Sequence, residues 1–193
     1  MAKISWKPGN MVYPLPAVMV TVRGKDKKDN IITIAWTGTI CTNPPMLYIS
    51  VRKERHSYTL LKESREFVVN LTTEDLVKAT DYCGVRSGSK VDKFKDTQLT
   101  KEEAKVVDCA MIQESPVNIE CKVRKIIPLG SHDMFVADVV NVNVDDQYME
   151  AGGRFDLSKA QPLVYSHGAY YKTGKKLGTF GYSVKKKSKK RKS

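Results

Sequence analysis

The order of apolar and polar residues predicts a chain built mostly of β-strands. Residues 117–124 alternate strictly, and 134–144 alternate near their end, the pattern of strands with one solvent-exposed face. Residues 17–22 are apolar at almost every position, so that strand is expected to be buried on both faces. Further short strands, rich in β-branched and aromatic residues, are expected at 31–36, 46–51 and 67–71.

Helical signals are short. One helix is expected at about Ser57–Ser64, and a second should start at a Thr72 cap and run to about Asp81, with Gly84 suited to its end. Residues 100–107 could form a third short helix capped by Thr100, and a non-helical conformation is equally compatible with them.

The remaining segments predict turns and irregular structure. Asn43-Pro44-Pro45 must be a turn or an edge, because proline lacks the N–H that a central strand needs. Polar turns are expected at 24–30 and 128–131, a loop at 86–98, an extended arm at 1–10 and an irregular wrapping segment at 148–177. Many strands with few helices predict the mainly β class, a β-barrel with peripheral helices.

Length and composition suit one domain, residues 1–184, with its own core. No apolar run is long enough to span a membrane and no signal-peptide pattern opens the chain, so we expect a cytoplasmic protein. The four cysteines show no Cys-x-x-Cys spacing and no neighbouring histidine, which favours reduced thiols over disulfides or a zinc site.

The formal charge of +12 is concentrated at one end of the chain. Residues 185–193 carry seven basic residues and no acidic one, leaving 26 basic and 21 acidic residues in the remaining body. A segment of that composition cannot bury apolar surface, so we expect a disordered tail. It is either simply solvated or binds polyanions weakly and without sequence preference.

Several nucleotide-binding and hydrolase motifs are missing. No Gly-x-Gly-x-x-Gly follows a strand and there is no Walker loop, so a Rossmann or P-loop site is not supported. Gly-x-Ser-x-Gly and His-Glu-x-x-His are also absent. What remains is Arg52-Lys53-Glu54-Arg55-His56-Ser57-Tyr58, where a strand delivers cations to the start of a helix. Arginine side chains and free helix N–H groups together suit a phosphate.

The stretch from Ile31 to Tyr58 and the residue before it contain a series of short motifs: Asn30, Ala35-Trp36-Thr37-Gly38, the Asn43-Pro44-Pro45 turn, Ser50-Val51-Arg52 and Arg55-His56-Ser57-Tyr58. In these residues the chain resembles the FMN-binding split-barrel proteins of the flavin reductase type, and within them the flavoredoxin-like branch. Two later blocks fit the same branch, 83–88 with 92–94 and 129–133. The resemblance covers about Pro14 to Gly178 and implies a split β-barrel, bound FMN and a homodimer with the flavin in the groove between subunits.

The resemblance also assigns roles to individual residues. Arg52, Arg55 and Ser57 would hold the phosphate, Trp36 would lie near the isoalloxazine ring, and backbone N–H groups of 37–41 could meet the flavin carbonyls. Lys93 would neutralise reduced flavin or contact the ribityl–phosphate chain, and Tyr165 would close over the ring. The full candidate set is Asn30, Ala35, Trp36, Thr37, Gly38, Thr39, Cys41, Ser50, Val51, Arg52, Arg55, His56, Ser57, Tyr58, Lys93, His132 and Tyr165.

Each assignment has a structural alternative in the sequence. The arginine cluster is also compatible with a solvated strand end, Trp36 with a core position, and Lys93 with an ordinary surface lysine. His132 could cap a turn instead of meeting a ligand. Cys41 and Cys83 suit small buried residues better than redox centres.

The predicted activity is transfer of hydride or electrons from NAD(P)H to flavin or onward to an acceptor. The chemistry would belong to the cofactor, so the lack of an acid–base dyad is compatible with an enzyme. One rival is an FMN carrier that passes electrons between proteins without turnover. Another is a basic barrel that binds nucleic acid through its tail.

Overall fold

The structure, a computed structural model, describes residues 1–185. Residues 186–193 lie outside the described part, and with them nearly all of the predicted basic tail. The mainly β class is confirmed. The largest sheet is antiparallel throughout, in the order β3 (Asp29–Ile34), β2 (Val18–Arg23), β6 (Glu66–Leu71), β9 (Val117–Leu129), β10 (His132–Val144), β5 (Met46–Arg52) and β4 (Thr37–Cys41).

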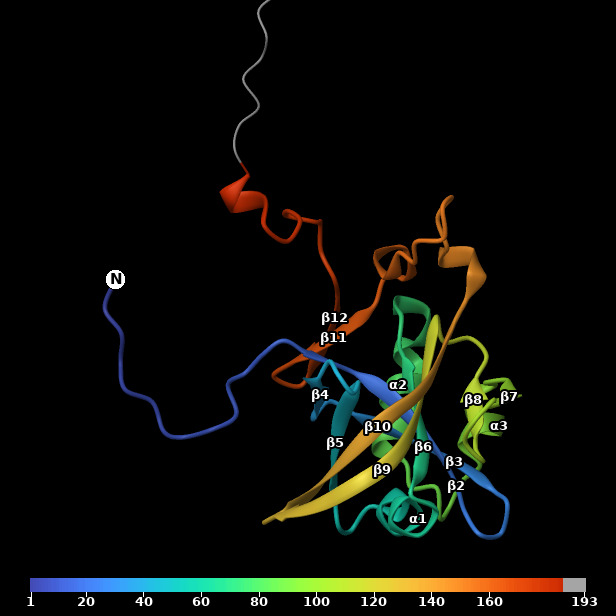
Figure 1. Ribbon diagram of the computed structural model, residues 1–193. Coiled ribbons are helices and arrows are strands. Elements are labelled where there is room, and N and C mark those ends of the chain that lie inside the picture. Colours follow the sequence, from blue (N-terminus) through green and yellow to red (C-terminus); the bar gives the residue numbers. More distant parts are fainter. Residues whose placement is uncertain (186–193) are drawn as a thin grey trace, which may run out of the picture.

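This sheet is curled but not closed, with β3 and β4 at its two edges (Figure 1). The predicted strands and the turn at 43–45 are present. Strands β9 and β10 form the long central hairpin, whose turn passes through Gly130 at a φ of 56°. Two irregularities in its register, at Val136/Ala137 and Val139/Asn141, accompany the bend of the pair.

Two smaller sheets lie in segments where the sequence predicted irregular structure or a possible helix. β1 (Leu15–Pro16), β11 (Leu163–Ser166) and β12 (Ala169–Lys172) form one of them. The segment 148–177 is therefore only partly irregular, because a tight turn at His167-Gly168, with both φ angles positive, lets its strands pair.

The second small sheet replaces the possible helix at 100–107. Strand β7 (Lys101–Glu103) pairs with β8 (Ala110–Ile112). The backbone N–H of Thr100 donates to the Glu114 carboxylate at 2.9 Å, which ties the start of β7 to the loop after β8. Hydrogen bonding between the two strands of this hairpin outweighs the weak local helix preference of residues 100–107.

The helices are short and lie around the sheet. α1 (His56–Ser64) confirms the first predicted helix. The second is a 3-10 turn, η1 (Glu74–Leu76), running into α2 (Val77–Val85), so it begins later than expected because the Thr72 hydroxyl bonds the Ala17 carbonyl instead of capping. Gly84 lies inside α2, where a Cβ would come within 3.3 Å of Thr33.

The predicted loop at 86–98 contains one further helix, α3 (Lys93–Thr97). The Asp92 side chain caps it by accepting from the Lys95 backbone N–H at 3.2 Å. Three further 3-10 turns are η2 (Asp146–Tyr148), η3 (Leu157–Ala160) and η4 (Tyr182–Val184).

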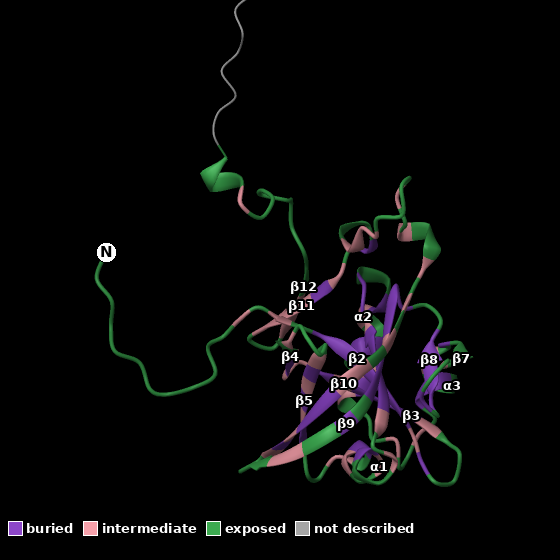
Figure 2. Cartoon of the chain, in the orientation of Figure 1, coloured by how far each residue is buried: buried purple, intermediate pink, exposed green. Residues whose placement is uncertain are grey.

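The central strands are largely buried and the terminal segments exposed (Figure 2), and the buried residues form separate clusters on the two faces of the sheet. The inner core is formed by alternate residues of β2, β3, β5, β6, β9 and β10, with Phe67 and Phe135 fully buried at its centre. On the other face, Met19 and Ile31 pack with residues of α2, α3 and β8. β2 is thus buried on both faces, as its continuous apolar run predicts.

Two terminal segments leave this body. Residues 1–12 have no regular structure and extend from the start of β1, and the segment after β12 extends in another direction (Figure 1). Both carry large apolar side chains in full contact with solvent, among them Trp6, Val12, Leu177 and Phe180. The extended N-terminal arm agrees with the sequence.

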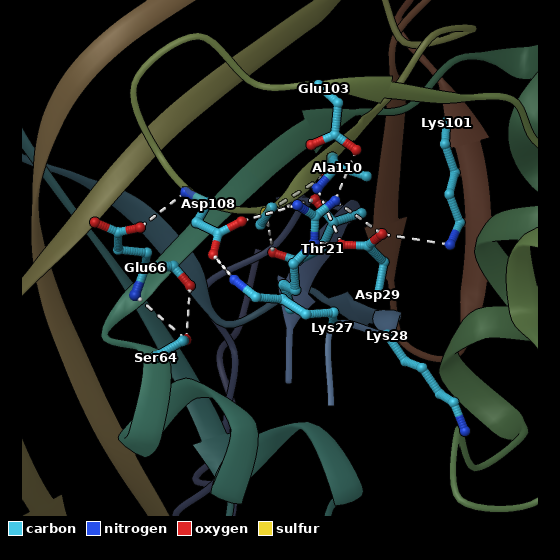
Figure 3. A network of polar contacts seen from close by, with 12 residues as sticks. Thr21, Lys27, Lys28, Asp29, Ser64, Glu66, Lys101, Glu103, Asp108 and Ala110 are labelled. Atoms are coloured by element: carbon cyan, nitrogen blue, oxygen red, sulfur yellow. Dashed lines mark hydrogen bonds and ion pairs between the residues drawn. The ribbon is translucent and has the colours of Figure 1, made fainter. Parts of the chain in front are cut away.

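One ion network fastens the β7–β8 hairpin to β2 and β3 (Figure 3). The Arg23 guanidinium contacts three carboxylates, those of Asp29 at 2.9 Å, Glu103 at 2.8 Å and Asp108 at 2.8 Å. Asp29 is the buried member, with a side chain 4 % exposed, and it also accepts from the Ala110 backbone N–H. These contacts raise the pKa of Arg23 and, against the opposing effect of burial, lower that of Asp29.

A second buried carboxylate organises the loop before β8. Glu120 on β9 is inaccessible to solvent and accepts backbone N–H groups of residues 105–107. It also accepts from the side chains of Asn141 and Asn143 at 2.7 and 2.8 Å. These donors outweigh the cost of burial and hold the pKa of Glu120 at about 2.

Candidate functional site

A cavity of about 310 Å³ opens between the ends of β3 and β5, the C-terminal turn of α2, and the β11–β12 hairpin. Eight of the residues singled out from the sequence line it. They are Ala35, Trp36, Ser50, Val51, Arg52, Arg55, His132 and Tyr165. These residues come from five separate segments, and the pairing of β5 with β10 places Arg52 directly opposite His132.

Aromatic side chains form one wall of this cavity. The Trp36 and His132 rings are nearly parallel, at 9°, with centroids 6.2 Å apart. Trp36 is half-buried and lines the cavity, so it is not one of the buried core residues. The Ser131 hydroxyl lies 2.9 Å from Nδ1 of His132, which orients the imidazole.

The β11–β12 hairpin supplies a second aromatic group. Tyr165 and Tyr170 pair across the hairpin, and their ring centroids lie 5.8 Å apart. The Tyr170 hydroxyl donates to Asp81 on α2 at 3.3 Å, and burial, followed by the Asp81 charge, raises the pKa of Tyr170 to about 12. Neither Asp81 nor Tyr170 was singled out from the sequence, since no local pattern connects residues so far apart.

A smaller cavity of about 150 Å³ adjoins the first. Its lining includes Arg55, His56, Ser57 and Lys93 from the predicted set, together with Arg86, Ser87 and Gly88 from the segment after α2. Arg55 and Ile32 line both cavities, so the two are neighbours across these side chains. The smaller cavity lies at the N-terminus of α1, whose first turn has no acidic residue and no side-chain cap.

Ser57 is fixed from behind by Asn30. The Asn30 amide donates to the Ser57 hydroxyl at 2.7 Å, which leaves the hydroxyl proton available to a ligand. Gly88 passes directly over this pair, and a Cβ there would lie 1.9 Å from the Asn30 oxygen. Only glycine therefore fits at position 88. Asn30 itself does not line the smaller cavity: it positions Ser57 and lines a separate polar cleft next to that cavity.

Lys93 is a buried residue and not an ordinary surface lysine. Its ammonium donates to the carbonyls of Ile31 at 2.6 Å and Cys83 at 2.7 Å, which leaves one N–H toward the smaller cavity. Burial is the main cause that lowers the pKa of Lys93 to about 8. The group thus keeps most of its charge at neutral pH.

The two arginines of the predicted cluster differ in their surroundings. Arg55 is half-buried, and its guanidinium bonds the Gly84 carbonyl at the end of α2. Arg52 is exposed, pairs with Glu54 at 3.3 Å and lines only the larger cavity. The cation placed beside Arg55 in the smaller cavity is Arg86. In the sequence, Arg86 belongs to the block 83–88 that carries the resemblance, but it was not among the candidate residues.

Besides Asn30, five predicted residues line neither cavity. Four lie on the edge strand β4: Thr37, Gly38, Thr39 and Cys41. The Thr37 hydroxyl donates to the Tyr48 carbonyl at 2.6 Å, and its N–H bonds the Ala35 carbonyl. Tyr58 points to the other side of the sheet, where its hydroxyl donates to Asp133 at 2.6 Å.

The cysteines behave as structural residues. All four are free thiols, and three of them are fully buried. Burial raises the pKa of Cys83 to about 11 and that of Cys109 to about 12, so neither forms a thiolate readily at neutral pH. Among residues 1–185, no helix has the length and apolar character needed to cross a membrane.

Comparison with known proteins agrees with this architecture. The chain is similar to the flavoredoxin of Desulfovibrio vulgaris (Miyazaki F), with a TM-score of 0.89 and 29% identity over 95% of this chain and all of the other. It is similarly related to a flavoredoxin from Methanosarcina acetivorans, with a TM-score of 0.86 and 28% identity over 96% and 100% of the two chains. The fold is therefore the split barrel that the sequence predicted.

Sequence comparison gives the same assignment. An uncharacterized protein of Archaeoglobus fulgidus is 31% identical over 162 residues, which are 84% of this chain and 89% of that protein. The family described as "Flavin reductase like domain" matches residues 10–174, which contain both cavities described above. The chain belongs to the flavin reductase like family.

Proposed function

We propose that this protein binds FMN with the isoalloxazine ring in the larger cavity and the phosphate in the smaller one. The observation that carries the proposal is the contiguity of the two cavities across Arg55. The larger cavity has aromatic walls, and the smaller one has three cationic side chains, Arg55, Arg86 and Lys93, against one carboxylate, Glu54. This is the order that a flat ring joined to a phosphate requires. Trp36 and Tyr165 would provide walls for the ring, with His132 at its edge.

The phosphate site combines three kinds of donor. Arg55 and Arg86 offer guanidinium groups, which match phosphate oxygens bidentately. The Ser57 hydroxyl and the uncapped N-terminus of α1 add neutral donors and a favourable dipole. Of the two roles that the resemblance implied for Lys93, its position in the smaller cavity favours contact with the ribityl–phosphate chain over neutralisation of the reduced flavin.

Bound FMN would supply the redox chemistry, and the protein would bind and orient it. We propose that the electron donor is NAD(P)H and that the protein is a flavin oxidoreductase. Membership in the flavin reductase like family supports that activity. The rival remains a carrier that exchanges electrons with protein partners, since two similar structures are flavoredoxins.

One experiment separates these functions. The purified protein is mixed anaerobically with FMN, and absorbance near 450 nm is followed on addition of NADH or NADPH. If the protein is an oxidoreductase, the absorbance bands of its oxidised FMN disappear on the time scale of one catalytic cycle after the donor is added. It then goes on oxidising excess NADH or NADPH when an electron acceptor is supplied. A carrier keeps its oxidised spectrum, and a protein that never takes up FMN but binds DNA in a salt-dependent way would support the nucleic-acid rival.

We also propose that the protein works as a homodimer in the cytoplasm. The apolar side chains of the two terminal segments, including Trp6 and Phe180, are exposed and are not covered by any other part of residues 1–185. A second copy would bury them across an interface of ordinary size. Sedimentation should therefore show a dimer, and a monomer that binds FMN with undiminished affinity would contradict this.

A further inference from the structure

The larger cavity contains one negative charge among cationic and neutral groups. Within the described residues, Asp81 is the only carboxylate in its lining, which also includes Arg52 and Arg55. Asp81 is exposed, whereas Ile32 and Ile34, which also line the cavity, are buried, so the carboxylate lies toward the solvent side of the cavity, here called its rim.

Asp81 is held in this position by the β11–β12 hairpin. The Tyr170 hydroxyl donates to its carboxylate at 3.3 Å, joining residues 89 positions apart in the chain. Tyr170 is half-buried, and its raised pKa keeps it a neutral donor. A surface aspartate without such a partner would be free to turn into solvent.

A charge at the rim matters for a reaction that creates charge. Bound FMN would accept a hydride from a dihydronicotinamide: the C–H bond at C4 of the donor would break and an N–H bond would form at flavin N5. The hydride carries both electrons, so the donor ring would change from neutral to a pyridinium cation while the flavin became the reduced anion. With the flavin held deeper in the cavity, as proposed above, the donor ring would approach from the rim, where Asp81 lies.

We propose that Asp81, positioned by Tyr170, is an electrostatic recognition residue for the nicotinamide ring that favours the positive charge developing on it. This inference rests on the proposed function. A carboxylate within a few ångströms attracts a cation and leaves a neutral ring nearly unaffected. Asp81 should therefore strengthen binding of the oxidised nicotinamide relative to the reduced form, and accelerate hydride transfer.

The opposite electrostatic effect makes the proposal falsifiable. If Asp81 acted mainly on the flavin, its negative charge would oppose the reduced anion, so Asp81→Asn would raise the flavin midpoint potential and speed reduction. If Asp81 acts on the donor, Asp81→Asn slows reduction about five- to twentyfold and leaves FMN affinity unchanged. The sign of the change therefore distinguishes the two roles.

The test uses a binding readout as well as rates. The FMN-loaded wild type and Asp81→Asn are titrated with 1-methylnicotinamide, a pyridinium cation methylated on its ring nitrogen, and with nicotinamide, which is neutral. We expect the preference for the cation to fall several-fold in the variant, and Tyr170→Phe to produce a smaller fall in the same direction. Asp81→Glu should restore part of the preference.

Asp96 provides a matched control. It also accepts from a tyrosine hydroxyl, that of Tyr82 at 2.5 Å, is also exposed, and lines neither cavity. Asp96→Asn should change neither the ligand preference nor the reduction rate. An unchanged cation preference in Asp81→Asn, or faster reduction, would overturn the inference. If neither NADH nor NADPH reduces the flavin of the wild-type protein, the proposed oxidoreductase function fails, and the inference about Asp81 fails with it.

Discussion

Two clusters of charged side chains, one around Arg23 and one formed by Arg55 and Arg86, have different surroundings. Arg23 meets three carboxylates and is largely buried, so its charge is satisfied within the chain (Figure 3). Arg55 and Arg86 line a cavity at a helix N-terminus, and Arg55 is bonded to a main-chain carbonyl. Both clusters contain arginine, but the carboxylates around Arg23 already neutralise it, so we propose that only the second cluster binds an anion.

The largest effect should come from breaking the satisfied cluster. Arg23→Ala leaves the buried Asp29 carboxylate without its main partner, and losing one member of a buried ion pair costs about 3–5 kcal/mol. We expect chemical denaturation to show a loss of that size in the free energy of unfolding, with FMN affinity of the folded protein unchanged. Lys27→Ala, which removes only an exposed pair with Asp108, should cost less than about 1 kcal/mol.

The next effect concerns pH and the Glu120 carboxylate. Its pKa is about 2 in the folded protein against an ordinary value of 4.5, so folding favours the charged form. This stabilises the protein by about 3 kcal/mol above pH 4.5, and the contribution is lost as the pH falls from about 4.5 to 2.

Unfolding measured across this pH range should therefore show a weaker acid dependence in Glu120→Gln than in wild type. The variant should also be less stable at neutral pH, because an amide cannot accept all five hydrogen bonds. Equal slopes in the two proteins would show that other carboxylates govern acid unfolding.

A smaller effect is expected at Arg52, which the sequence could not distinguish from Arg55. Arg52 is exposed, paired with Glu54 and absent from the smaller cavity. Arg52→Ala should weaken FMN no more than about fivefold, the range of an exposed ion pair. A loss beyond tenfold in fluorescence titration would place the phosphate at the mouth of the larger cavity instead.

The smallest effect is expected for the basic tail. Deleting residues 185–193 removes seven positive charges and no large apolar residue. FMN affinity and melting temperature should stay the same, while any binding to polyanions at low salt should weaken. A clear fall in melting temperature on deletion would show that the tail contributes to the folded structure.

The comparison also shows what a sequence can reveal about such a site. The strands, α1 and the Arg55-His56-Ser57 segment could be predicted because periodicity and strand ends are local features. The sheets formed by β7–β8 and β11–β12 could not, because pairing partners override weak local preference. The burial of Lys93 could not be predicted either, because its ammonium is held by the main-chain carbonyls of Ile31 on β3 and Cys83 on α2, which only the fold brings together.

The site residues divide in the same way. Residues beside the strand ends, such as Trp36 and Arg52, were found from the resemblance of their segment. Asp81 and Tyr170 meet only through the fold, and Arg86 was passed over because it lay in a segment interpreted as loop. The assigned backbone contacts of β4 remain predictions, because these residues line neither cavity.

The central claim is that the open arginine cluster binds the FMN phosphate. Its most direct test is to compare FMN with riboflavin, which has the same ring and ribityl chain but no phosphate, in wild type and in Arg55→Ala. A hydrogen bond to a charged group contributes about 1.5–3 kcal/mol, so FMN affinity should fall roughly ten- to a hundredfold.

The matched control is Arg65→Ala. Arg65 also bonds main-chain carbonyls, those of Val123 and Arg124, but lines neither cavity, so its loss should spare both ligands. The account predicts that the FMN-to-riboflavin affinity ratio collapses in Arg55→Ala and is unchanged in Arg65→Ala. An unchanged ratio in Arg55→Ala would contradict it, because the phosphate would then have to bind elsewhere.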